Sequence, residues 1–273
     1  MFFSSYIRSI LNPKLVDNIK RTLGFASLDV DYELSKISRL GRFKTGETIL
    51  IHPNFRFADS ESFIYQFHEI FRNDAFFFKT KEANPLILDC GSNIGVSVCY
   101  FKSIFPSSKI IAFEPDSAIF SILKHNTSHF IPSEVEIHNK AVWIEETSLS
   151  FQPDGADGGR LLNTGELSAS TVRLSDYLQT EINLLKIDIE GAEKFVLPSI
   201  AENLKNVEYL FLELHVEEKE PELLEHTCQL LREQGFRYKL DTIGSVNFQS
   251  FHDPDTYSMQ INIYAVNENF RSF

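Results

Sequence analysis

Apolar and polar positions follow a repeating pattern along the chain from residue 85 onward. Short apolar runs predict buried strands, and the segments that follow most of them have helical spacing. The runs are PLILDCG (85–91), KIIAFEP (109–115), VEIHNKAVW (135–143), INLLKIDIEG (182–191) and VEYLFLELH (207–215). Unbroken apolar strands separated by amphipathic helices predict an α/β fold with a mostly parallel sheet that is covered on both faces.

The remaining segments give a less regular picture. RYKL (237–240) and SMQINIYAVN (258–267) predict two strands without a helix between them, hence a terminal hairpin with one strand antiparallel. TSLSFQPDG (147–155) predicts an extra strand, and residues 155–170 a Gly/Ser-rich loop. Nearer the start, ETILIHPNF (47–55) predicts a strand, and residues 59–71 predict a helix with Ser60 or Ser62 near its cap.

This pattern divides the chain into two parts. The alternation of predicted strands and helices indicates that residues 81–273 form a ligand-binding α/β domain. Residues 1–80 form an N-terminal α/β extension of helices and a short strand, which we expect to cover the cofactor or shape the acceptor site. Its first 25 residues form either a helix packed on the domain or a partner, or a basic amphipathic helix in weak peripheral contact with a membrane.

The net charge, the apolar stretches and the cysteines disfavour some classes of protein. The net charge of −12 and the pI near 5.2 disfavour a nucleic-acid binder, because an acidic surface repels phosphate backbones. No stretch approaches the roughly 20 apolar residues of a membrane span. The three cysteines are odd in number, irregularly spaced and without a CxxC motif, so we expect reduced thiols in a cytoplasmic protein.

The segment ILDCGSNIG (87–95) contains a candidate nucleotide loop. Asp89 ends the first strand, and Gly91 and Gly95 bracket a tight turn into a helix. Glu114 ends the next strand, where a carboxylate accepts hydrogen bonds from ribose hydroxyls. The spacing D-x-G-x-x-x-G is neither the dinucleotide fingerprint nor a P-loop, and the acidic side chains suit a ligand without phosphate. The loop resembles the first motif of Rossmann-type S-adenosylmethionine methyltransferases.

The segment LLKIDIEGAE (184–193) places charges on an otherwise apolar strand. Side chains alternate along a strand, so Lys186, Asp188 and Glu190 share one face. Because burying unpaired charges is costly, we expect the strand to emerge from the sheet here, with both carboxylates lining the crevice beside Asp89. A structural ion pair followed by an acidic helix start, with Glu190 and Glu193 complementing the helix dipole, is the alternative.

Several segments together resemble the FkbM family of methyltransferases. They are ILDCGSNIGVSVCYFK, KIIAFEPD, NKAVW, STVRLSDYL, LLKIDIEGAE and YLFLELH, and they occur in the family's order. The resemblance covers residues 60 to 236. The resemblance implies a Rossmann-type methyltransferase sheet with S-adenosylmethionine as cofactor. It also implies O-methyl transfer to a hydroxyl group of a small-molecule, natural-product or glycan acceptor.

The resemblance also implies roles for individual residues. Around the methionine part of the cofactor it places Asp89, Gly91, Ser92, Asn93 and Gly95. Glu114 would hold the ribose, with Pro115 flanking the adenine. Along the adenine edge it places Asn139, Lys140 and Ala141, and Asp188 would face the methionine end and the acceptor.

Methyl transfer to a hydroxyl group requires a group that removes its proton, and three alternatives are open. Glu213 and His215 are two residues apart on one strand face, and His215 is the preferred base because its ordinary pKa lies near neutrality. A carboxylate at Asp188 or Glu190 with a raised pKa is the second. The third is a divalent cation such as Mg²⁺, held by Asp188, Glu213 and water. Alternatively, Glu213 and His215 bond only to each other or to loop amides.

Two other functions remain open on the sequence. A catalytically silent adenosyl-binding scaffold or regulatory module would keep the nucleotide loop without turnover. A nicotinamide-dependent oxidoreductase is disfavoured by the spacing of that loop. The sequence names neither the acceptor nor the oligomeric state, since acceptor pockets are built from loops that vary freely.

Overall fold

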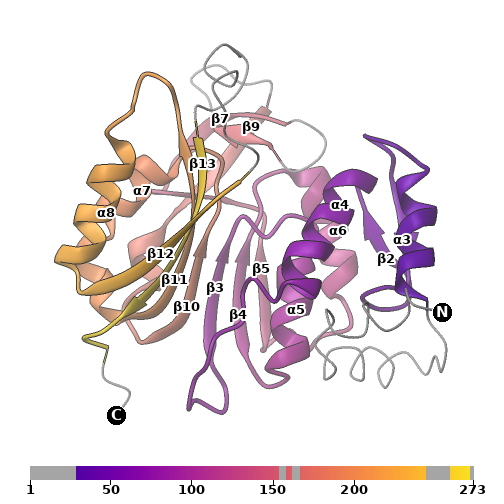
Figure 1. Ribbon diagram of the computed structural model, residues 1–273, viewed down its shortest axis with the longest axis horizontal. Coiled ribbons are helices and arrows are strands. Elements are labelled where there is room, and N and C mark those ends of the chain that lie inside the picture. Colours follow the sequence, from indigo (N-terminus) through magenta and orange to yellow (C-terminus); the bar gives the residue numbers. More distant parts are fainter. Residues whose placement is uncertain (1–28, 154–157, 162–166, 244–258, 271–273) are drawn as a thin grey trace, which may run out of the picture.

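A seven-stranded sheet forms the centre of the protein (Figure 1). The structure is a computed structural model that describes residues 29–153, 158–161, 167–243 and 259–270. The strand order is β12-β13-β11-β10-β3-β4-β5. These strands are β3 (Leu86–Cys90), β4 (Lys109–Phe113), β5 (Val135–His138), β10 (Ile182–Ile187), β11 (Val207–Val216), β12 (Phe236–Thr242) and β13 (Met259–Asn267). All neighbouring pairs are parallel except the two made by β13, so the mostly parallel sheet is confirmed.

The terminal hairpin is also confirmed, with a detail that the sequence did not specify. β12 and β13 pair antiparallel, but β13 lies between β11 and β12 rather than at the edge. β12 is therefore parallel to β11, and β13 is the strand of opposite direction. The insertion brings β13 beside β11, where residues 209–216 of β11 pair with residues 266–259 of β13.

Helices cover both faces of the sheet, as Figure 1 shows. On one face lie α5 (Val96–Ile104) and α6 (Ser117–Thr127), and on the other α7 (Glu193–Ser199) and α8 (Leu223–Glu233). Consecutive strand residues enter different cores, because side chains alternate across a sheet. Ile87 belongs to the core under α5, whereas Leu88 belongs to the core under α7 and α8. This double burial explains why the strands are unbroken apolar runs in the sequence.

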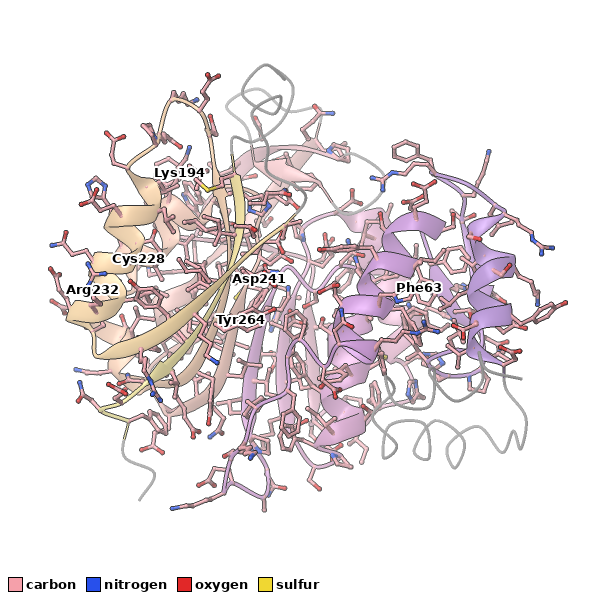
Figure 2. All side chains as sticks on the ribbon, in the orientation of Figure 1. Phe63, Lys194, Cys228, Arg232, Asp241 and Tyr264 are labelled. Carbon is pink, nitrogen blue, oxygen red and sulfur yellow. The ribbon has the colours of Figure 1, made fainter. Side chains whose placement is uncertain are left out.

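The described N-terminal elements share the core on the α5 face. They are α3 (Val30–Ser38), β1 (Gly46–Thr48), β2 (Phe55–Phe57), α4 (Ser60–Gln66) and the π-helix η1 (Phe67–Arg72). The Phe63 ring, labelled in Figure 2, lies 5.3 Å from Phe57 and 6.0 Å from Phe67 between ring centroids. These phenylalanines pack in one cluster with Ile87 of the sheet. Several of the 25 phenylalanines of the chain therefore fix the extension against the domain.

In the N-terminal part the predicted strand is wrong, whereas the helix with Ser60 and Ser62 near its cap is confirmed. Residues 47–55 do not form one strand, because β1 ends at Thr48 and pairs as a short hairpin with β2, which begins at Phe55. The cap of α4 is Asp59, whose carboxylate accepts the Ser62 N–H at 3.0 Å. Asp59 also accepts the Phe43 N–H and lies 3.3 Å from Arg42, and these contacts explain why the acid occupies this position.

Predictions for residues 135–173 are wrong in two further places. The run 135–143 is broken into β5 and β6 (Ala141–Trp143), which belong to different sheets. Asn139 causes this break, since its amide donates to the carbonyls of Glu114 and Pro115 at 2.9 and 3.0 Å. The expected loop at 155–170 contains β8 (Arg160–Leu161) and the start of β9 (Leu167–Arg173). These strands form a four-stranded sheet with β6 and β7 (Ser148–Gln152), in the order β6-β9-β7-β8.

Of the two remaining short helices, η2 (Leu174–Tyr177) connects β9 to β10, and η3 (Ala201–Asn206) lies between α7 and β11. Cys90, Cys99 and Cys228 are buried free thiols. None of the helices in the described part of the chain is long and apolar enough to cross a membrane. The expected N-terminal helix lies in residues 1–28, outside the described residues.

Candidate functional site

A cavity of about 410 Å³ lies at the edge where the parallel strands end. Ligand crevices of α/β sheets occupy this edge, and the volume lies within the usual range of small-molecule sites. Seven of the residues expected at the cofactor line it: Gly91, Asn93, Glu114, Pro115, Lys140, Ala141 and Asp188. The structure therefore brings together residues from four strand ends that are far apart in the sequence.

Gly91 brings two of these strand ends into contact. Its φ is 85°, in the left-handed region. A Cβ on residue 91 would lie 1.8 Å from the carbonyl oxygen of Asp188, so only glycine fits. The N–H groups of Gly91 and Ser92 donate to the Phe113 carbonyl at 3.1 and 2.9 Å. The loop after β3 is thus held against the ends of β10 and β4 by backbone contacts.

Glu114 follows β4 and holds the same loop through its carboxylate. Its oxygens accept the N–H groups of Asn93 at 3.0 Å and Asp116 at 2.9 Å. The side chain is buried, and burial, with a contribution from Asp116, raises the pKa of Glu114 to about 8 despite the two backbone donors. Each carboxylate oxygen has a second lone pair, and the side chain lines the cavity. Glu114 therefore combines a role in the loop with the capacity to accept ligand hydroxyl groups.

Asp89 lies beneath the cavity and does not line it. Its carboxylate accepts the Ser97 hydroxyl at 2.5 Å and lies 3.4 Å from Nζ of Lys186. The Lys186 ammonium also donates to the Gly91 carbonyl at 2.9 Å and to Asp188 at 3.3 Å. Burial alone would lower the pKa of Lys186, but the charges of Asp188 and Asp89 raise it above its ordinary value. Lys186 is thus a buried cation that joins the two loops.

Three other expected cofactor residues support the site from outside the larger cavity. The Ser92 hydroxyl donates to the Asp89 carbonyl at 2.8 Å. A Cβ on Gly95, whose φ is 89°, would lie 2.8 Å from Leu123 of α6, so this glycine allows α5 to pack closely there. Asn139 holds the break between β5 and β6. Ser92 alone of the three lines the smaller neighbouring cavity.

The strand β10 ends earlier than the sequence predicted. It stops at Ile187, so Asp188 and Glu190 lie in a turn rather than on a continuing strand face. Glu193, which begins α7, accepts the N–H groups of Ile189 and Gly191, both at 2.9 Å. Glu190 has a φ of 55°, and this turn directs it to the cavity that it lines. Asp188 and Glu190 therefore both reach the expected cavity, but from a turn rather than from one face of a strand.

His215 lies behind this turn, away from the cavity. It is 1% exposed and lines neither cavity at this edge. Its Nδ1 is 3.3 Å from Glu193, and its Nε2 is 3.4 Å from Glu190 and 3.5 Å from Glu213. Burial would lower the pKa of His215, but the hydrogen bond and charge of Glu193 and the charges of Glu190 and Asp188 raise it to about 10. A histidine in this environment is a cation at neutral pH.

Glu213, two residues earlier on β11, does reach the cavity. It lines both the larger cavity and the smaller one beside it. Burial raises the pKa of Glu213 above its ordinary value, and the charge of Asp188 adds to the effect, while His215 opposes it. A carboxyl group with a raised pKa at a cavity wall suits proton transfer near neutral pH. Ligand atoms of Asp188, Glu213 and His215 also lie within 4.8 Å of one another, so these side chains can approach one cation.

The structure adds residues that the sequence did not single out. Arg42, from the N-terminal part, and Gln260 line the larger cavity, and Asn262 lines the smaller one. Gln260 and Asn262 alternate with apolar residues along β13, in the sequence MQINIY. Two amides on one face of an otherwise apolar strand are the signal that was available. Tyr65 and Gln66 of α4 line both cavities.

The sequence around this cavity matches a known family. Residues 89–238, more than half of the chain, match the model of the methyltransferase FkbM domain. The chain belongs to the FkbM methyltransferase family. The resemblance inferred from the motifs is thereby confirmed. The matched residues run from the end of β3 through β11 and supply most of the cavity wall.

The chain is similar to several curated methyltransferases over part of their length. Methyltransferase 1 of Beauveria bassiana is 32% identical over 143 residues, which are 42% of this chain and 57% of that protein. Hexuronic acid methyltransferase AglP of Haloferax volcanii is 26% identical over 141 residues, 49% of this chain and 57% of that protein. The 31-O-demethyl-FK506 methyltransferase FkbM of Streptomyces tacrolimicus is 27% identical over 207 residues, 61% of this chain and 77% of that protein. The chain thus spans little more than half the length of the first two.

Proposed function

We propose that this protein is an S-adenosylmethionine-dependent O-methyltransferase that acts on a hydroxyl group of a sugar, a glycan or a natural product. The observation that carries the proposal is the cavity at the carboxyl edge of the sheet, where Asn93, Glu114 and Asp188 converge inside the FkbM domain. The relatives support the acceptor class, since one is named for a hexuronic acid and another for 31-O-demethyl-FK506.

The residues present fit the cofactor. Glu114 offers a carboxylate for the ribose hydroxyls, and Pro115, Lys140 and Ala141 supply a wall for the adenine. Asp188 and Gly91 line the same cavity, where they could face the methionine part. When bound, S-adenosylmethionine supplies an electrophilic methyl group on a positively charged sulfur, and an acidic cavity stabilises that charge.

Glu213 is the residue that we propose as general base, in place of His215. Its carboxylate lines the cavity, and its raised pKa lies close to that of a working base. With S-adenosylmethionine bound, the cofactor would supply the methyl group to the acceptor oxygen, and Glu213 would take the hydroxyl proton. His215 and Lys186 remain positively charged and offset the negative charge of the neighbouring Asp188 and Glu190.

A divalent cation held by Asp188 and Glu213 is the second candidate for activating the hydroxyl group. The spacing of these side chains and His215 favours it. Against it, Asp188 already pairs with the Lys186 ammonium at 3.3 Å, and a protonated His215 does not ligate a metal. We therefore propose a metal-independent reaction, and unchanged turnover in EDTA is the expected result.

The N-terminal extension, residues 1–80, belongs to the acceptor side in this proposal, and residues 81–273 form the cofactor-binding catalytic domain. Arg42, Tyr65 and Gln66 of the extension line the larger cavity, opposite Glu114 and Lys140 of the domain. Three buried free thiols support a cytoplasmic location, and the net charge of −12 supports a partner other than nucleic acid.

Calorimetric titration with S-adenosylhomocysteine, with NAD as control, tests the cofactor. We expect micromolar binding of the first alone, weakened by Glu114→Ala at the cavity and by Asp89→Ala beneath it. Binding of NAD instead would favour an oxidoreductase and overturn the proposal. An acceptor screen with and without Mg²⁺ follows, with S-adenosylhomocysteine formation as readout. Tight cofactor binding without turnover on a broad panel of sugars and natural products would favour the silent scaffold.

A further inference from the structure

A second, smaller cavity adjoins the larger one on the side of Glu213. Its volume is about 80 Å³, and it shares Tyr65, Gln66, Asp188 and Glu213 with the larger cavity. A water molecule takes about 30 Å³ of liquid volume, so this space holds only a small group. It suits one edge of a ring whose remainder lies in the larger cavity.

Asn262 is the unusual residue of this smaller cavity. It is 8% exposed, and its buried Oδ1 has no hydrogen-bond partner among the described residues. It lies on β13 directly opposite Glu213 of β11. A buried acceptor without a partner destabilises the folded protein, and such a group in a cavity wall points to a ligand donor. The donor would lie beside the carboxyl group that we propose as the base.

Aromatic rings and polar groups share the walls around Asn262. The Phe211 ring lies 4.7 Å from Phe76 and 5.2 Å from Tyr264 between centroids, at edge-to-face angles. Figure 2 shows Tyr264 near Asp241, where β13 and β12 cross in that view. Gln66 and Glu69 line the cavity from α4 and the π-helix η1. Sugar rings have apolar faces and hydroxyl-bearing edges, and walls of this mixed kind match both.

The charges around the smaller cavity are predominantly negative. Glu69, Asp188 and Glu213 line it, and Lys186 is the one lysine or arginine among the described residues that do so. The Lys186 ammonium is already engaged by Asp188 and by the Gly91 carbonyl. Burial raises the pKa of Tyr65 to about 12, and the charges of Glu213, Glu69 and Asp188 add to this effect. An acceptor carboxylate or phosphate would therefore find no available cation here.

We propose that the smaller cavity binds one edge of a neutral, hydroxyl-rich ring such as an uncharged sugar, and that Asn262 accepts a hydrogen bond from one of its hydroxyl groups. The inference rests on the proposed methyl transfer, and it adds the charge class of the acceptor and a specificity-determining residue. The hydroxyl group that Asn262 holds is a neighbour of the one that faces Glu213.

Saturation-transfer NMR on the full chain loaded with S-adenosylhomocysteine tests this proposal. The probes are two matched pairs, methyl β-glucopyranoside with methyl β-glucuronide and methyl β-galactopyranoside with methyl β-galacturonide. We expect at least one neutral glycoside to bind about tenfold more tightly than its uronide. Asn262→Leu should weaken binding of that glycoside about tenfold, the value of one hydrogen bond, and leave the affinity for S-adenosylhomocysteine unchanged.

Matched variants separate recognition from folding. Asp241→Asn changes the exposed neighbour of Asn262 on β12, which lines neither cavity, and should leave glycoside binding unchanged. Because Oδ1 has no partner to lose, Asn262→Leu should not lower the unfolding temperature, whereas a structural asparagine would. Asn262→Ala should weaken glycoside binding in the same way, and it does so without placing a branched side chain in the cavity wall.

Three outcomes would overturn the inference while S-adenosylhomocysteine still binds. The uronides bind as tightly as the neutral glycosides, the Asn262 variants retain glycoside binding, or no neutral glycoside binds the loaded protein. Failure of S-adenosylhomocysteine itself to bind is a separate result, and it rejects the proposed function instead.

Discussion

The Cα of Gly91 faces the carbonyl oxygen of Asp188 so closely that a Cβ on residue 91 would lie 1.8 Å from that oxygen. The Asp188 N–H in turn donates to the Cys90 carbonyl at 3.1 Å, and Lys186 donates to the Gly91 carbonyl. The loop after β3 and the turn after β10 therefore form one unit. Any change that separates them moves both the expected cofactor loop and Asp188.

Gly91→Ala should destabilise the protein far more than Gly41→Ala. Both glycines have a positive φ, 85° and 79°, but a Cβ at residue 41 meets nothing within 4 Å. Gly41→Ala should lower the free energy of unfolding by about 1 to 2 kcal/mol, the cost of the backbone conformation alone. Gly91→Ala adds the collision with Asp188, so we expect a loss above about 3 kcal/mol and no S-adenosylhomocysteine binding. Denaturant unfolding and calorimetry measure both, and equal costs would contradict the proposed contact.

Glu213→Gln should slow methyl transfer about 100-fold to 10,000-fold, the usual range for a lost general base. S-adenosylhomocysteine affinity should remain, because the substitution removes a charge but keeps the shape. Glu208→Gln, at the other end of β11 beside Asn183, is the matched control and should keep full activity. Initial rates with the acceptor found by the screen decide the question. The wild-type rate should rise with pH as the Glu213 pKa is passed, since the base must be ionised.

His215 should make folding stability dependent on pH. Its pKa is raised in the folded state, so its contribution is complete below about 6.5 and is lost as the pH rises to about 10. His215→Gln should therefore cost stability at low pH and little at high pH. Glu193, Glu190, Glu213 and Asp188 face this histidine, and the first three are within 3.5 Å.

The measurement is the difference in unfolding temperature between wild type and His215→Gln across this pH range. Taking the difference matters because buried Glu114 also titrates near pH 8 in the folded protein. A difference that does not change with pH would show that His215 is neutral when folded. A neutral His215 would again be a candidate for the general base.

Glu114 should give cofactor affinity its own pH dependence. Burial raises the pKa of Glu114 to about 8, and the ionised carboxylate is the better acceptor for ribose hydroxyls. Affinity for S-adenosylhomocysteine should therefore increase as the pH rises through 8. Glu114→Gln should bind more weakly and lose this dependence, because an amide does not titrate. Exposed Glu136 on β5 offers the control Glu136→Gln, which should match wild type at each pH.

Much of the fold follows from apolar periodicity, because each central strand is buried on both faces. Leu184 and Leu185 enter opposite cores, and this double burial produces the continuous apolar run that marks β10. Periodicity does not show where a strand leaves its sheet. The break after His138 depends on one amide, that of Asn139, bonding to carbonyls far away in the sequence.

The site was only partly predictable for a related reason. Sequence order identified the strand ends, and so Gly91, Glu114 and Asp188 were expected at one edge. The choice of His215 as base relied on its ordinary pKa, whereas Glu193, 22 positions earlier in the chain, makes it a buried cation. Asn262 was missed because only the pairing of β13 with β11 places it opposite Glu213.

The position of β13 also sets an order of assembly. Among the described strands β12 pairs with β13 alone, and β13 follows it in the chain, so β12 has no partner strand in the sheet until residues 259–267 have been synthesised. Until then β11 presents a bare edge, and unpaired edges recruit other chains. During synthesis on the ribosome, the expected nucleotide loop precedes Asn262 by most of the domain. A nascent chain therefore contains the expected cofactor loop well before the residue that we propose to hold the acceptor has been synthesised.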